Sequence, residues 1–401
     1  AIVITQGFAD ADDEGRFLQE KIVALLKERG LRILGPNTIG VANALERFTS
    51  SFIEMQPDKA PVGQVAQSGL FMMGHHLMGN GPAGFCMSID LGNTCDIDFV
   101  DVLEYYEQDD NVRVIQCHTE AIEDGRAFVE AASRISASKP VIALKAGRTV
   151  TGQAAVASHT GAAAGAAMVY QAAFSKAGVV PAEDAEELRL LTKAFVTYRP
   201  PTGRRVAVMS FSGGANILAA DAIEKAGLSL ANLSEATKSN LWNLFPSWLN
   251  VENPLDVWIP LSKNFQTAFP TVLESLLGDE GVDGVICIYC SYPRPKYERF
   301  DSSAHIAAIA GKYPEKPVLC WSYGLDIEGF TRDIENDGTA MVFPSLDDAA
   351  RTFAKMADYA AHQHRRRDAG NQPGSDARDA NIEAVLNPFW NALTAKFRIF
   401  L

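Results

Sequence analysis

The sequence predicts an α/β protein built on parallel sheets and divided into more than one domain. Apolar, β-rich runs alternate with helical patterns along the chain. From residue 60 onward the same order of parts occurs twice: strand, Ser-Gly turn, helix, strand, helix, Lys-Pro, strand. The length of 401 residues, with 47% hydrophobic and 21% charged residues, is enough for more than one core.

Residues 1–58 form a β-α-β pattern. The run "AIVITQG" is a short strand, and "DDEGRFLQEKIVALLKERG" places Leu18, Ile22, Leu25 and Leu26 on one helical stripe with Gly30 as a stop. The next strand is "LRILGPN". No earlier strand is present to pair with it, so we expect the second half of a Rossmann-like nucleotide domain whose first half is missing.

The repeated order predicts two flavodoxin-like sheets made by duplication, at residues 59–200 and 201–365. The first copy contains "VGQVAQ", "VRVIQCHTE" and "KPVIALKAGRT", and the second contains "RRVAVMSF", "VDGVICIYCSY" and "EKPVLCWSYGLD". In residues 366–401 the polar stretch "HRRRDAGNQPGSDARDA" is typical of a linker. Apolar periodicity then returns, so we expect the start of a further segment.

Charge and composition argue against several classes of protein. The 36 basic and 49 acidic residues give a net charge of −13, which disfavours a nucleic-acid partner. No apolar run approaches the roughly 20 residues of a membrane span, and no signal peptide opens the chain, so we expect a cytoplasmic protein. Cys287 and Cys290 form a C-x-x-C on one strand, where alternation sends them to opposite faces; no metal site is expected.

Two Ser-Gly turns are candidate phosphate sites, Ser68-Gly69 and Ser212-Gly213-Gly214. Each follows a predicted strand and opens a helix, whose unpaired N–H groups and dipole favour an anion. The alternative is a small residue kept only for packing.

His159 lies in "SHTGAAAG", just after a strand that ends near Ala143, at the expected carboxyl edge of the sheet. Its small neighbours leave room for a reactant, and a neutral imidazole is a competent nucleophile. Glu120 closes the strand "VIQCHTE" at the same edge and is the candidate partner that fixes the imidazole tautomer. The alternatives are a histidine packed in a loop and an ordinary strand-end carboxylate in water.

Eight motifs resemble the NDP-forming (ADP-forming) acyl-CoA synthetases, relatives of succinyl-CoA ligase. They occur in order over residues 1–365: "GPNTIG", "VAQSG", "GNTCDID", "TEAIEDGRAF", "KPVIALKAGRT", "SHTGAAAG", "FSGGANILAAD" and "ENPLD". The resemblance implies an acid–thiol ligase that converts carboxylic acid, CoA and ATP into acyl-CoA, ADP and phosphate. A phosphohistidine and an acyl phosphate are the implied intermediates.

The same resemblance assigns roles to residues. His159 resembles the phosphoryl carrier, and Glu120 the glutamate that orients it. The two helix N-termini that cradle the phosphoryl group correspond to Ser68, Gly69, Gly213 and Gly214. The residues expected to contact CoA are Thr5, Gln6, Gly7 and Asn37. The residues expected near the substrate pocket are Thr38, Asn93 and Asn253. The family usually has cysteine where this chain has Thr38, so a thiol there is not needed or the substrate preference differs.

The resemblance also implies partners. ATP with Mg²⁺ would be bound mainly by an ATP-grasp domain or beta subunit outside this chain, in a homodimer or heterotetramer. The competing hypothesis is a non-catalytic, CoA-responsive regulatory module of the same fold. For the acid, the bulky residues near the predicted pocket edges favour an aryl or medium-chain substrate over acetate, unless they are core residues; they are Phe71, Met72, Met73, Trp248 and Trp258.

Overall fold

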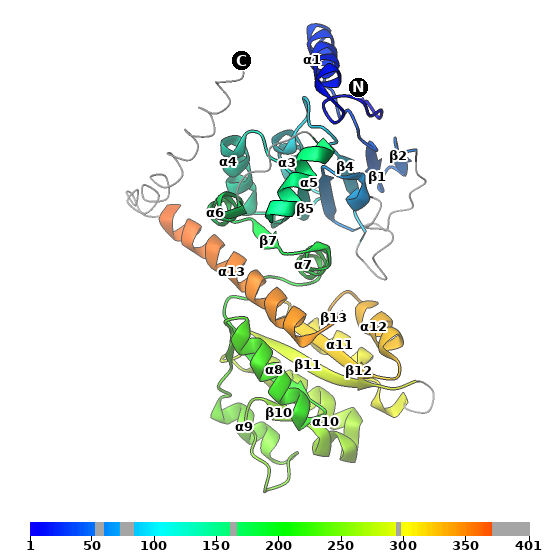
Figure 1. The fold of residues 1–401 in the computed structure, drawn as a ribbon. Coiled ribbons are helices and arrows are strands. Elements are labelled where there is room, and N and C mark those ends of the chain that lie inside the picture. The colour runs from blue at the N-terminus through cyan, green and yellow to red at the C-terminus, as the bar shows by residue number, and fades with distance from the viewer. Residues whose placement is uncertain (53–59, 73–83, 161–166, 294–297, 371–401) are drawn as a thin grey trace.

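The computed structural model describes residues 1–52, 60–72, 84–160, 167–293 and 298–370. These residues form two α/β units stacked on each other, with an N-terminal extension on the first (Figure 1). The fold class expected from the sequence is therefore confirmed. The domain boundaries themselves stay a prediction.

The N-terminal extension contains helix α1 (Asp13–Glu28). Asp12 caps it by accepting a hydrogen bond from the Gly15 N–H at 2.8 Å, and Gly30 ends it with a φ of +67°. The two strands expected on either side reduce to one parallel bridge between Ile2 and Leu34. The predicted apolar stripe of α1 is half exposed, since Leu18 and Leu25 are 46% and 52% exposed.

The first sheet has seven strands in the order β2-β1-β4-β3-β5-β6-β7. The strands from β4 to β7 are parallel, as expected, but β1 runs antiparallel to both β2 and β4. This edge hairpin lies within residues 1–58, and the strands that follow it in this sheet are parallel, as expected. The elements of this unit are β1 (Val41–Asn43), β2 (Phe48–Thr49), β3 (Val62–Ala66), β4 (Met87–Asp90), α3 (Phe99–Gln108), β5 (Val114–Thr119), α4 (Gly125–Ser136), β6 (Val141–Lys145), α5 (Val150–Thr160), α6 (Ala167–Ala177), β7 (Val180–Ala182) and α7 (Ala185–Thr197).

The second sheet has the order β10-β8-β11-β12-β13 and is parallel throughout. Strand β9 pairs with the first residues of β8, and β10 pairs with its last residues. The elements of this unit are β8 (Arg205–Ser210), α8 (Gly213–Lys225), β9 (Ser229–Leu230), α9 (Glu235–Trp242), β10 (Leu255–Asp256), α10 (Trp258–Gly278), β11 (Gly284–Ser291), η1 (Glu298–Phe300), α11 (Ser303–Ala310), β12 (Val318–Gly324), α12 (Ile327–Glu335), β13 (Met341–Phe343) and α13 (Leu346–Gly370).

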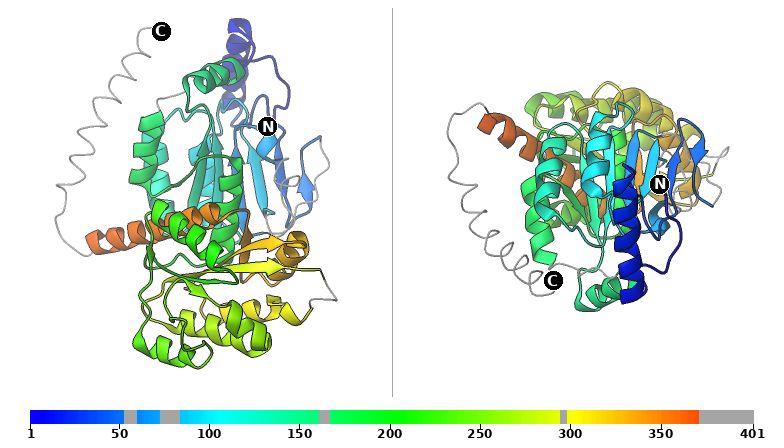
Figure 2. Two further views of the ribbon diagram at one scale, coloured as in Figure 1. Left: turned by 60° about the horizontal axis from the view of Figure 1, so that its bottom comes forward. Right: turned by 90° about the horizontal axis from the view of Figure 1, so that it is seen from above.

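The two sheets share a layer of helices. One continuous apolar core joins the facing sides of both sheets to α7, α8 and α13, and α13 crosses between the units in Figures 1 and 2. Separate cores cover the outer faces, under α3, α4 and α6 on the first sheet and under α9, α10 and α11 on the second. The repeated halves are therefore packed face to face.

Buried polar contacts also join the units. Lys193 on α7 contacts Glu335 on α12 at 2.5 Å, and their side chains are 4% and 5% exposed. The Tyr198 hydroxyl donates to the Val318 carbonyl at 2.6 Å and accepts from the Met341 N–H at 2.6 Å. In the described part of the chain, no helix combines the length and apolarity needed to cross a bilayer.

Candidate functional site

Four polar residues lie at the carboxyl ends of neighbouring strands in the first sheet. Ser68 follows β3, Asp90 ends β4, Glu120 follows β5 and Lys145 ends β6. These strands are adjacent in the order β4-β3-β5-β6. The edge at which ligands usually gather in such sheets therefore carries two acids, a cation and the opening of a helix.

Glu120 is buried, with 7% of its surface exposed. This excludes the alternative of an ordinary carboxylate in water. Its N–H donates to Gln67 Oε1 at 2.6 Å, and its carbonyl accepts from Lys145 Nζ at 2.8 Å. Both backbone polar groups of Glu120 are thus fixed by buried side chains.

Lys145 is a buried cation beside Glu120. It is 4% exposed, and its Nζ lies 4.7 Å from the centre of the Tyr170 ring. Burial lowers the pKa of Lys145 to about 8, although the charge of Glu120 acts in the opposite direction. A positive charge at this edge favours negatively charged reactants.

The Ser68-Gly69 turn opens a helix over residues 69–72, where the Phe71 N–H donates to the Ser68 carbonyl at 3.0 Å. A Cβ added at Gly69 would lie 2.9 Å from Ile39 Cγ2. Packing against Ile39 therefore explains the glycine by itself. A role in phosphate binding stays a prediction.

Two distant loops meet beside this turn. Gly92 has a φ of +57°, and a Cβ there would lie 2.3 Å from the Pro36 carbonyl oxygen. The Asn93 N–H donates to that carbonyl at 2.9 Å, and Asn37 Nδ2 donates to Asn93 Oδ1 at 3.3 Å. Two predicted site residues, Asn37 and Asn93, are thereby brought together.

The N-terminal segment joins the same cluster. Asn93 Nδ2 donates to Asp10 Oδ1 at 2.9 Å and to Gln19 Oε1 at 3.1 Å, and the Asn37 N–H donates to the Thr5 carbonyl at 2.9 Å. Burial opposes ionisation of Asp10, but hydrogen bonds from Asn93 and the backbone hold its pKa below the usual value. The exposed residues Thr5, Gln6 and Gly7 thus form a segment that meets Asn37 at Thr5, and their contact with CoA stays a prediction.

Thr38 is buried, 2% exposed, and its hydroxyl contacts Asp90. The Ile39 N–H also donates to Asp90 Oδ2, at 2.7 Å. Burial raises the pKa of Asp90 to about 6, and the nearby charge of Glu120 adds to this. Thr38 therefore anchors the loop to β4 in this structure.

The second Ser-Gly turn opens α8 at Gly213. Gly213 and Gly214 are exposed, and the N-cap Ser212 makes no side-chain capping hydrogen bond. Ala215 and Ala219 of α8 belong to the same core as Met72. The two helices that open at the Ser-Gly turns therefore pack on one shared core.

Asn253, expected near the substrate pocket, lies two residues before β10 and beside β8 of the second sheet. Its Oδ1 accepts from the Val208 N–H at 2.8 Å, and its Nδ2 donates to the carbonyls of Val206 and Ala231 at 2.9 and 3.0 Å. These bonds fill the gap that β9 and β10 leave along β8. The side chain therefore has a structural role, and a place near the substrate pocket stays a prediction.

His159 lies on α5, whereas the sequence indicated a loop. The helix begins after Thr149, whose hydroxyl accepts from the Gly152 N–H at 3.0 Å, and its alanine content favours helix. A Cβ on Gly147 would lie 2.7 Å from Val156 Cγ2, so the glycine lets the helix pack close to the end of β6. The structure describes His159 through its backbone only, so its contact with Glu120 stays a prediction.

The bulky residues that favoured an aryl acid lie in different environments in the structure. Met72 is fully buried in the shared core, and Phe71 stacks on His118 with ring centres 3.8 Å apart. Trp248 and Trp258 are 72% and 53% exposed, and Met73 lies outside the described residues. Phe71 and Met72 therefore do not support that preference.

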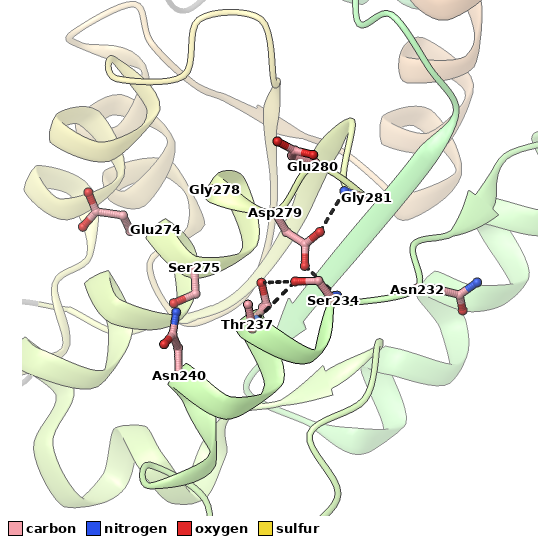
Figure 3. A pocket seen from close by; sticks show the side chains of 11 residues that line it. Asn232, Ser234, Thr237, Asn240, Glu274, Ser275, Gly278, Asp279, Glu280 and Gly281 are labelled. Atoms are coloured by element: carbon pink, nitrogen blue, oxygen red, sulfur yellow. Dashed lines mark hydrogen bonds between the residues drawn. The ribbon is translucent and has the colours of Figure 1, made fainter.

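A cavity of about 590 Å³ lies elsewhere, between α9 and the end of α10 (Figure 3). Its Asp279 carboxylate accepts from the N–H groups of Ser234 and Gly281 at 2.8 and 2.7 Å. This cavity lies near the start of β11, at the amino edge of the second sheet. The candidate residues singled out from the sequence lie at the carboxyl ends of strands. In the described ranges, no three His, Cys, Asp or Glu side chains gather as a metal site requires.

The sequence did not single out Gln67, Asp90, Lys145, Asp10 or Gln19. All of them are buried or half-buried polar residues, and the first three lie at strand ends in the motifs "VAQSG", "SIDLGN" and "ALKAG". A polar residue that directly follows an apolar strand run was the available signal.

Comparison with known proteins places this geometry in a family. Residues 59–195 match the model of the succinyl-CoA ligase like flavodoxin domain. The alpha subunit of ADP-forming acetate–CoA ligase II from Pyrococcus furiosus is 37% identical over 359 residues, covering 88% of this chain and 77% of that subunit. A trans-feruloyl-CoA synthase from an unknown prokaryotic organism is 30% identical over 400 residues, covering 96% of this chain and 55% of its own.

A solved structure agrees. The dinucleotide forming acetyl-coenzyme A synthetase 1 of Ca. Korarchaeum cryptofilum, in complex with phosphate and ADP, matches with a TM-score of 0.81 at 27% identity over 92% of this chain and 79% of that one. The chain spans about half the length of several other relatives that it matches. The chain belongs to the family of ADP-forming acetate–CoA ligases, acid–thiol ligases that form carbon–sulfur bonds.

Proposed function

We propose that this chain supplies the acid- and CoA-handling part of a ligase that converts a carboxylic acid, CoA and ATP into acyl-CoA, ADP and phosphate. One observation supports this most strongly: the carboxyl edge of the first sheet gathers Ser68, Asp90, buried Glu120 and buried Lys145 beside the loop of Asn37 and Asn93. The family to which the chain belongs supplies the type of reaction.

His159 is the proposed phosphoryl carrier. Its ring nitrogen forms a bond to phosphorus as ATP loses ADP, and the buried carboxylate of Glu120 stabilises the positive charge that develops on the ring. A carboxylate oxygen of the acid then attacks phosphorus, and the N–P bond breaks to release an acyl phosphate. We assign the charging by ATP and Mg²⁺ to an ATP-grasp part or beta-type subunit.

The two Ser-Gly turns are the proposed cradles of the phosphoryl oxygens. At each turn a helix opens with N–H groups that have no intrahelical partner, and such groups stabilise charge on equatorial oxygens. The first is Ser68-Gly69 and the second Gly213-Gly214, and their helices pack on one shared core.

The residues near Asn37 fit a place for CoA. Thr5, Gln6 and Gly7 are exposed, and a Cβ at Gly7 would meet no atom within 4 Å, so a ligand can approach the backbone. Here the thiol sulfur attacks the acyl carbon, the C–O bond to phosphate breaks, and the thiol proton leaves with the phosphate. The nearby Asn93 is the proposed contact at the acyl end.

The test is phosphoryl labelling of the complete enzyme with γ-labelled ATP. We expect acid-labile, base-stable label on the wild-type protein, no label on His159→Ala and greatly reduced label on Glu120→Gln. A hydroxylamine assay across acetate, succinate, benzoate and hydroxycinnamate identifies the acid. Unchanged labelling of His159→Ala would refute the proposed carrier, and CoA binding without any turnover would favour a regulatory module.

A further inference from the structure

We propose that Gln67 is a positioning residue, which sets the backbone at Glu120 relative to the helix that opens at Ser68. This inference rests on the proposed function and deepens it. Gln67 is the last residue before Ser68 and is 5% exposed. It thus stands between the proposed phosphate cradle and the proposed partner of the phosphoryl carrier.

One oxygen atom makes the connection. Gln67 Oε1 accepts hydrogen bonds from Glu120 N at 2.6 Å, from Ala121 N at 2.9 Å and from Thr119 Oγ1 at 3.2 Å. The Gln67 N–H donates to the His118 carbonyl at 3.2 Å, so the main chain of Gln67 continues the β3-β5 pairing. Three consecutive residues of the Glu120 segment are therefore bonded to one side chain.

Two further side chains, buried Lys145 and half-buried Tyr170, hold the same segment. Lys145 Nζ donates to the Glu120 carbonyl at 2.8 Å, and the Ile122 N–H donates to the Tyr170 hydroxyl at 2.9 Å. After the last ladder bonds of β5, these contacts take the place of sheet hydrogen bonds. The position of Glu120 therefore depends on side chains from β6 and α6 and, most directly, on Gln67.

The chemistry explains why an acceptor is needed at residue 67. The N–H groups of Glu120 and Ala121 converge on a single acceptor atom. A buried N–H group without a hydrogen-bond partner lowers the stability of the folded protein. A methionine at position 67 has similar bulk but accepts no comparable hydrogen bond. A glutamate keeps an oxygen acceptor at the same reach.

The chain contains a matched control. Gln116 lies on β5, is 2% exposed, and bonds to Gln64 and Thr192 at 2.7 and 2.9 Å. Both bonds go to residues outside the segment at Glu120, so Gln116→Met removes a buried amide of the same kind from the same sheet.

The experiment measures the rate of label transfer from γ-labelled ATP to the complete enzyme, with kcat, KM for CoA and thermal unfolding. We expect Gln67→Met to lower the labelling rate and kcat about 10- to 100-fold, the cost of a displacement of about 1 Å at a reacting group, with KM for CoA nearly unchanged. Gln67→Glu should recover most of the loss. Gln116→Met should lower the unfolding temperature while labelling at the wild-type rate.

The outcomes separate the two proposals. Wild-type enzyme that never carries label at His159 refutes the proposed function, and this role with it. A labelled wild type with unimpaired Gln67→Met, or equal losses in Gln67→Met and Gln116→Met, refutes the positioning role alone. Should Gln67→Met not fold, Gln67→Asn replaces it, because its oxygen falls short by about one C–C bond of 1.5 Å and should give the same loss of labelling.

Discussion

The buried ion pair between Lys193 and Glu335 joins the two units, and we expect a large, measurable loss of stability when only one partner is removed. The side chains are 4% and 5% exposed, and Glu335 Oε1 also accepts from the Val342 N–H at 3.1 Å. Lys193→Met leaves a buried carboxylate without its cation. Breaking a buried pair from one side costs about 3–5 kcal/mol, because the remaining charge is uncompensated.

The assay is urea unfolding at neutral pH in a double-mutant cycle. Lys193→Met should lower the free energy of unfolding by about 3–5 kcal/mol, whereas Lys193→Met combined with Glu335→Gln should recover most of it, because the amide stays bonded to the Val342 N–H and carries no charge. The exposed pair Lys225–Asp347 is the control, with side chains 75% and 46% exposed.

Lys225→Met should cost less than about 1 kcal/mol, the range of surface ion pairs. The reasoning is refuted if Lys193→Met costs no more than Lys225→Met, or if the double variant is as unstable as the single one. Either result would mean that burial of this pair carries no charge penalty.

Three further predictions follow from single side chains. Gly92→Ala should raise KM for CoA and destabilise the protein by more than about 1 kcal/mol, measured by steady-state kinetics and urea unfolding, since its Cβ would meet the Pro36 oxygen at 2.3 Å. Tyr198→Phe should cost about 1–3 kcal/mol in urea unfolding, because two buried backbone groups lose their partner. Burial raises the pKa of Asp90 to about 6, so the folded protein holds this proton more tightly than the unfolded chain. The stability of the wild type should therefore fall relative to Asp90→Asn as pH rises from about 4 to 6, and the difference should stay constant above about pH 6. Urea unfolding of both proteins across this pH range is the measurement, and parallel curves would contradict the prediction.

The strand–turn–helix units of both sheets could be predicted from the sequence. The strands at 62–66, 114–119 and 141–145 fall within the apolar runs that the sequence marked as strands, with ends one or two residues from the expected ones. The hairpin of β1 and β2 was missed because strands of three and two residues carry no periodicity. The extended segments around α1 were overestimated as strands, because a run of β-rich residues does not show whether a partner strand pairs with it.

The sequence predicted which residues belong to the candidate site better than it predicted which of them contact one another. Glu120 was singled out by its place at a strand end, and its burial agrees with a role inside the edge. The structural role of Asn253 was missed because an amide can bond to backbone as well as to a ligand, and the sequence does not show the break between β9 and β10. Gln67 was missed because residue spacing does not reveal that three donors converge on one oxygen.

The common core between the sheets limits how this protein can be divided. If the chain were cut near residue 200, α7 would lose its packing on the second sheet and α8 its packing on the first. Apolar faces of both fragments would then be exposed to water. We therefore expect neither half to persist as a separately expressed piece. Heat or denaturant should melt both sheets in a single transition.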